Sequence, residues 1–176
     1  MDMNTNVKKS GVSQRSLAEK LVESRLSNVD EFGGIEHRLE LISNVNGVDY
    51  VNDSKATDVN STWYSLECMD KPVVWIVGLS DLETDYTIFN DLVNQNVKAI
   101  VCLGKNFNGS LNTLIERVDS FSEASSVAEA VQISCSLSVE GDVVLFSPAC
   151  SSFHLYQNYK DRGEQFRKSV LELPQR

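Results

Sequence analysis

The 176-residue sequence lacks three features, and each absence disfavours a class of protein. No apolar run approaches the ~18 residues that a membrane span needs, and the N-terminus shows no basic region followed by an apolar stretch, so we expect a cytoplasmic protein without a membrane partner. Lysine and arginine form no cluster, and 16 of them against 25 aspartates and glutamates give a net charge of −9. That balance disfavours nucleic acid as the main ligand.

Cysteine is also sparse, and the spacing of the cysteines is not that of a metal site. The four cysteines are far apart, contain no C-x-x-C pair and have only two histidines as possible co-ligands. This pattern disfavours a zinc site or a disulfide framework. We therefore expect buried free thiols in a reducing compartment. A catalytic role for Cys150 is disfavoured as well, because the sequence assigns no histidine and acid pair to it.

The chain divides into a short N-terminal region and one main domain. Residues 1–12 are polar and without periodicity, which is typical of a disordered leader. Apolar residues at helical spacing predict a short amphipathic helix over 13–26, and Gly33-Gly34 closes a helix-and-linker segment over 13–34. We expect the main domain over residues 35–176.

Strand and helix patterns alternate along the main domain. The expected strands are 37–45, 48–53, 72–78, 97–104 and 142–147, and the expected helices are 57–69, 86–94, 111–117, 125–137 and 159–173. Asn46-Gly47 is a strong hairpin signal between the first two strands. The pattern predicts an α/β fold with a Rossmann-like, mostly parallel sheet, helices on both faces and an opening β-hairpin.

Ligands of parallel sheets gather beyond the carboxyl ends of the strands. Four loops are expected there, over 53–57, 78–85, 104–109 and 147–152. The loop over 53–57 places Lys55 and the hydroxyls of Ser54 and Thr57 before a helix, which favours an anionic ligand. The alternative is that Ser54 or Thr57 only caps that helix.

Five motifs, in order, carry a resemblance to a known family. They are His37-Arg38-Leu39-Glu40, Asn52-Asp53-Ser54-Lys55-Ala56-Thr57, Trp75-Ile76-Val77-Gly78, Ser147-Pro148-Ala149-Cys150-Ser151-Ser152-Phe153 and Asn158-Tyr159-Lys160-Asp161-Arg162-Gly163-Glu164-Gln165-Phe166. With them the chain resembles the C-terminal domain of the Mur ligase family, of the MurD type, from about residue 30 to residue 173.

The resemblance implies the third domain of an ATP-dependent ligase that adds D-glutamate to UDP-MurNAc-L-alanine in peptidoglycan synthesis. It implies that Arg38 reaches the ATP phosphates, Asp53 the ribose, and Lys55, as the catalytic residue, the transferred phosphate. The same resemblance implies that D-glutamate is held by four residues, Thr57, Ser152, Phe153 and Tyr159. It also implies Mg²⁺, with ligands mainly outside this chain.

The sequence departs from the family pattern in ways that affect substrate binding. Leu82 stands at the position of a lysine that grips D-glutamate in the family, Asp58 replaces an asparagine, and His154 replaces an aspartate. We therefore expect weak D-glutamate binding by this domain alone. No G-x-x-x-x-G-K-[ST] phosphate loop occurs in the sequence, so we expect no turnover without the N-terminal and central ligase domains. The alternative hypothesis is a diverged, non-catalytic nucleotide-binding module of the same fold.

Overall fold

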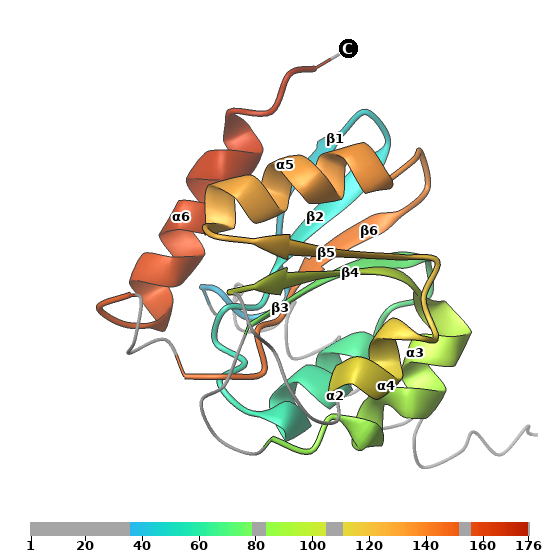
Figure 1. Ribbon diagram of the computed structural model, residues 1–176. Coiled ribbons are helices and arrows are strands. Elements are labelled where there is room, and N and C mark those ends of the chain that lie inside the picture. Colours follow the sequence, from blue (N-terminus) through green and yellow to red (C-terminus); the bar gives the residue numbers. More distant parts are fainter. Residues whose placement is uncertain (1–35, 79–83, 105–110, 152–155, 176) are drawn as a thin grey trace, which may run out of the picture. The chain divides into compact units, whose positions relative to one another are not determined.

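The computed structural model describes residues 36–78, 84–104, 111–151 and 156–175 (Figure 1). The elements follow one another as β1 (Glu40–Val45), β2 (Val48–Asn52), α2 (Val59–Glu67), β3 (Val73–Gly78), the 3-10 turn η1 (Thr87–Phe89), α3 (Asn90–Asn96), β4 (Val97–Leu103), α4 (Leu111–Ile115), β5 (Ser120–Ala124), α5 (Val127–Leu137), β6 (Val143–Phe146) and α6 (Tyr159–Leu171). The predicted leader and the helix over 13–26 lie outside the described residues.

The strands form one six-stranded sheet in the order β1-β2-β6-β3-β4-β5. Only the β1–β2 pairing is antiparallel within this sheet, and β2–β6, β6–β3, β3–β4 and β4–β5 are parallel. The hairpin turns at Asn46 and Gly47, both with positive φ, as an Asn-Gly turn requires. The predicted mostly parallel sheet opened by a hairpin is therefore confirmed.

Helices cover both faces of the sheet. In Figure 1, α5 and α6 lie on one face, and α2, α3 and α4 lie on the other. A separate apolar core fills each side: one gathers Phe146, Val131 and Phe166, and the other gathers Trp75, Leu66 and Phe89. Every residue of β3 is buried, which explains why its sequence is a continuous apolar run.

Three expectations about elements need correction. The strand β5 was not expected, because Ser120–Ala124 is polar and lacks the apolar run of the inner strands; it forms the edge of the sheet beside β4. The first strand begins only at Glu40, since His37 (φ 65°) and Leu39 (φ 45°) are left-handed and cannot continue a strand. The helix predicted over 57–69 is shorter, because Asp58 caps it and Cys68 ends it.

The cysteines are free, as the sequence predicts, but only two of the four are buried. All four cysteines are free; Cys102 and Cys150 are buried, whereas Cys68 and Cys135 are partly buried. In the part of the chain that the structure describes, no helix has both the length and the apolar character needed to cross a membrane.

Candidate functional site

The loops after β2 and β6 meet at one end of the sheet. Backbone hydrogen bonds join the strand ends: Asp53 N donates to Phe146 O (2.8 Å), and Gly78 N donates to Pro148 O (2.8 Å). A Cβ on Gly78 would overlap the Cys150 sulfur, so glycine permits this loop to lie directly over β3. The described parts of these loops therefore lie together, as parallel strands require.

Arg38 and Lys55 are brought together by the backbone. Lys55 N donates to His37 O at 3.0 Å, which ties the loop after β2 to the segment that precedes β1. The Arg38 side chain is exposed and that of Lys55 is half-buried. Neither cation forms an ion pair with any residue that the structure describes.

Asp53 stands two residues before Lys55 and is almost fully buried, with 2% exposed. Its Oδ1 accepts from Leu39 N (3.2 Å), and its Oδ2 accepts from the hydroxyls of Ser65 (2.5 Å) and Ser147 (2.7 Å). Burial raises the pKa of Asp53 to about 6, although these hydrogen bonds and the Arg38 charge lower it. The carboxyl group is therefore ionised at neutral pH.

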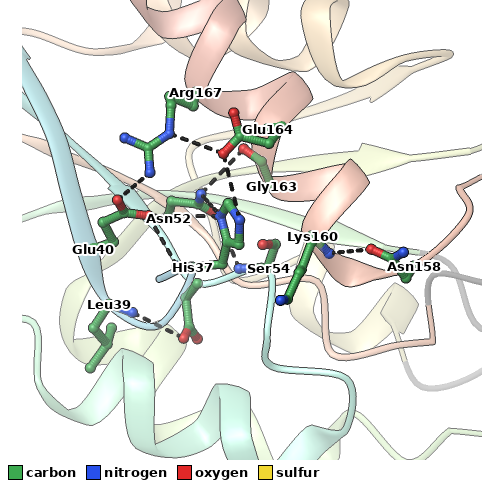
Figure 2. Close-up of polar contacts among 11 residues, drawn as sticks. His37, Leu39, Glu40, Asn52, Ser54, Asn158, Lys160, Gly163, Glu164 and Arg167 are labelled. Atoms are coloured by element: carbon green, nitrogen blue, oxygen red, sulfur yellow. Dashed lines mark hydrogen bonds and ion pairs between the residues drawn. The ribbon is translucent and has the colours of Figure 1, made fainter. Parts of the chain in front are cut away.

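A buried polar cluster supports the Arg38 segment, as Figure 2 shows. Asn52 Nδ2 contacts His37 Nδ1 (2.9 Å) and donates to Gly163 O (3.2 Å), while its Oδ1 accepts from Ser54 N (3.2 Å). Because the Gly163 carbonyl and the Ser54 amide fix the Asn52 orientation, His37 Nδ1 must be the acceptor. The other ring nitrogen, Nε2, faces the Glu164 carboxylate at 3.6 Å.

Arg162, on α6, connects this helix to the loops after β2 and β6. The side chain is buried; its Nη1 donates to Cys150 O (3.0 Å) and its Nη2 donates to Ser54 O (2.9 Å). Burial lowers the pKa of Arg162. The sequence places His37 and Arg162 in motifs but predicts no role for either, because only the tertiary fold shows which carbonyls and amides they contact.

The remaining predicted residues are less enclosed. Thr57 is exposed and lies one residue before the α2 N-cap. The cap is Asp58, whose Oδ1 accepts from Ser61 N (2.9 Å), so neither Ser54 nor Thr57 caps the helix. Tyr159, half-buried at the first position of α6, meets the His37 ring edge-on, with 6.5 Å between the ring centroids.

Several expectations concern residues outside the described ranges. Ser152, Phe153 and His154 lie outside the described residues, as does Leu82. Their predicted roles in D-glutamate binding therefore remain predictions.

One group among the described residues has the composition of a metal site. Glu36, His37 and Glu164 each offer a ligand atom, and these atoms lie within 4.8 Å of one another. A metal on His37 Nε2 needs the proton on Nδ1, where it would face the amide hydrogens of Asn52. Mg²⁺ also prefers oxygen ligands and octahedral geometry. The group does not fit the implied Mg²⁺, and no chemical step is assigned to it.

Residues 37–150 match the family described as "Mur ligase, glutamate ligase domain". The chain is 45% identical over 162 residues to UDP-N-acetylmuramoylalanine–D-glutamate ligase of Christiangramia forsetii, covering 90% of this chain and 36% of that protein. It is 47% identical over 146 residues to the enzyme of the same name from Porphyromonas gingivalis, covering 82% and 32%. The chain belongs to the Mur ligase glutamate ligase domain family.

Solved structures agree with the fold of this Mur ligase domain. The crystal structure of MurF ligase from Thermotoga maritima in complex with ADP matches with a TM-score of 0.50 and 14% identity, over 84% of this chain and 37% of that chain. A bifunctional folylpolyglutamate synthase/dihydrofolate synthase from Yersinia pestis matches with a TM-score of 0.50 and 17% identity, over 80% and 32%. The Mur ligase domain described here spans about a third of the length of the curated relatives it matches.

Proposed function

We propose that this chain is the C-terminal domain of an ATP-dependent ligase that adds D-glutamate to UDP-MurNAc-L-alanine in peptidoglycan synthesis. The names of the relatives at 45% and 47% identity support the substrate class. The chain covers only 36% and 32% of these relatives. This leaves room in the relatives for N-terminal and central domains, which in the proposal supply the UDP site and the phosphate loop. These two domains are the partners that the proposal requires.

The cations Arg38 and Lys55 carry the proposal. They come from two segments joined by the Lys55 N to His37 O hydrogen bond. Among the described residues neither forms an ion pair, although the charges of Arg38 and Asp53 interact. A phosphate group accepts charge-assisted hydrogen bonds from such cations. Arg38 then orients the ATP phosphates, and Lys55 neutralises charge on the phosphate being transferred to the substrate carboxylate.

The other residues have supporting roles in the proposal. A carboxylate offers about four acceptor sites, and three donors reach Asp53, which leaves capacity for a ribose hydroxyl. Thr57, just before α2, and Ser152 hold the carboxylates of D-glutamate, and the backbone around Phe153 and Tyr159 completes the pocket. The Mg²⁺ that the family resemblance implies would balance phosphate charge, and its ligands would lie mainly outside this chain.

A hybrid enzyme tests the proposal. Residues 36–176 replace the C-terminal third of the Porphyromonas gingivalis relative, and phosphate release is measured with UDP-MurNAc-L-alanine, with and without D-glutamate. In the hybrid, Lys55→Ala should lower kcat/KM for ATP by about 10-fold or more, since a hydrogen bond to a charged group contributes about 1.5–3 kcal/mol.

Lys168→Ala is the matched control, because that lysine is 78% exposed on α6. Equal activity of the Lys55→Ala and Lys168→Ala hybrids would remove Lys55 from the site.

The diverged, non-catalytic module is the second candidate. Leu82 at the family's lysine position and the acids Asp81, Glu83 and Asp85 in the same loop favour it, because they should repel a dicarboxylate. The hybrid separates the two candidates. D-glutamate-dependent phosphate release supports the ligase, whereas ADP binding without such release supports the module.

A further inference from the structure

The inner side of α2 is unexpectedly polar. The buried residues of this helix are Thr62, Ser65 and Leu66, although a helix that covers a sheet normally buries apolar side chains. Two of the three are therefore hydroxyl residues, spaced three apart on one side of the helix. A buried hydroxyl needs a partner, and this requirement points to the group that α2 covers.

That group is the Asp53 carboxylate. Ser65 Oγ lies 2.5 Å from Asp53 Oδ2, against 3.1 Å from the helix carbonyl of Ser61. Ser147 Oγ, at the end of β6, donates to the same oxygen at 2.7 Å and lies 2.9 Å from the Thr62 hydroxyl. Two hydroxyls from two different elements therefore converge on one oxygen.

The other carboxylate oxygen reaches the Arg38 segment. Asp53 Oδ1 accepts from Leu39 N (3.2 Å), the residue after Arg38, and Leu39 has an unfavourable positive φ of 45°. Asp53 itself stands two residues before Lys55. A fixed Asp53 carboxylate thus holds the backbone beside both cations of the candidate site.

The charge of Asp53 depends on these donors. Burial raises its pKa to about 6, and three hydrogen bonds, from Ser65, Ser147 and the Leu39 amide, work against burial. Among the described residues, the positive charge of Arg38 also lowers the pKa of Asp53. Removing one hydroxyl removes one of the hydrogen bonds that lower the pKa, so the pKa of the carboxyl group should rise toward neutral pH.

We propose that Ser65 is a positioning residue of the nucleotide site: together with Ser147 it holds the Asp53 carboxylate ionised and oriented, and thereby fixes the backbone beside Arg38 and Lys55. The nucleotide in this statement rests on the proposed function. The hydrogen-bonded arrangement itself does not.

The direct test is an NMR titration of the Asp53 carboxyl carbon in the full 176-residue chain. The wild-type midpoint should lie near pH 6, and Ser65→Ala should move it up by about one pH unit, as the loss of one hydrogen bond to a charged acceptor implies. Ser147→Ala should move it in the same direction, and Ser65→Thr, which keeps the hydroxyl, should restore the wild-type midpoint.

Ser136→Ala is the matched control, since this exposed serine on α5 also bonds to a helix carbonyl, that of Ile133, at 2.7 Å. Its midpoint should equal that of the wild type. Wild-type midpoints in folded Ser65→Ala and Ser147→Ala would overturn the proposal. If Ser65→Ala does not fold, Ser147→Ala decides by the same criterion.

A second measurement separates this proposal from the proposed function. In the hybrid ligase, the acid limb of kcat/KM for ATP should move up with the NMR midpoint in Ser65→Ala and stay in place in Ser136→Ala. A moved midpoint with an unmoved acid limb would overturn the positioning role and leave the ligase assignment intact. A hybrid without D-glutamate-dependent activity would instead overturn the proposed function, with the titration result still standing.

Discussion

Replacing Arg162 with alanine should destabilise the domain strongly, because this buried side chain ties α6 to the loops after β2 and β6. The substitution removes two hydrogen bonds from a charged donor, to Cys150 O (3.0 Å) and Ser54 O (2.9 Å). Each such bond contributes about 1.5–3 kcal/mol. Desolvation of the guanidinium group offsets part of that sum, so we expect a loss of about 3 kcal/mol in the free energy of unfolding.

Urea unfolding of the 176-residue chain, followed by tryptophan fluorescence, measures this loss. Arg162→Met retains much of the side-chain volume and should recover part of the stability, because it fills the cavity that alanine leaves but does not restore the two hydrogen bonds. Arg117→Ala is the control, since the exposed side chain of this arginine donates to Asn94 Oδ1 at a long 3.3 Å, and the substitution should change stability by at most about 0.5 kcal/mol. An Arg162→Ala loss no larger than that of Arg117→Ala would refute the reasoning.

Three further predictions concern the same end of the sheet. The folded-state pKa of Asp53, about 6, is above the usual 3.8, so the folded chain binds more protons than the unfolded chain between these two values, and its stability should fall by about 3 kcal/mol as the pH rises from about 3 to about 7; Asp53→Asn should flatten that part of the curve in urea unfolding at each pH. Gly163→Ala should lower the melting temperature, because a Cβ would overlap the His37 ring and the Ser54 hydroxyl, and an unchanged melting temperature would contradict this packing. Asp58→Ala should cost about 1 kcal/mol in chemical denaturation through loss of the α2 N-cap, and a neutral effect would place the helix start elsewhere.

Much of the fold follows from local patterns. The buried run of β3 and the Asn46-Gly47 turn dictate their own structures, and the alternation of strands and helices dictates the parallel sheet. The edge strand β5 escaped prediction because Ser120–Ala124 pairs with only one neighbour and carries no apolar signal. The start of β1 escaped because the positive φ at Leu39 depends on a distant carboxylate.

The candidate site divides in the same way. Loop position and residue type point to Lys55, because strand ends and helix starts are readable from the sequence, whereas Arg38 and Asp53 are predicted from the family resemblance. The donors that hold Asp53 come from Ser65 and Ser147, 12 and 94 residues away along the chain. No local pattern encodes such a contact, since it exists only after α2 and β6 have packed.

The hybrid ligase tests the central claim most directly, with mass spectrometry of its product. Residues 36–176, joined to the first two domains of the Porphyromonas gingivalis relative, should convert UDP-MurNAc-L-alanine, ATP and D-glutamate into the D-glutamyl product. Lys55→Ala should abolish most of this product, and Lys168→Ala should not. A hybrid that folds and binds ADP but makes no D-glutamyl product would contradict the account.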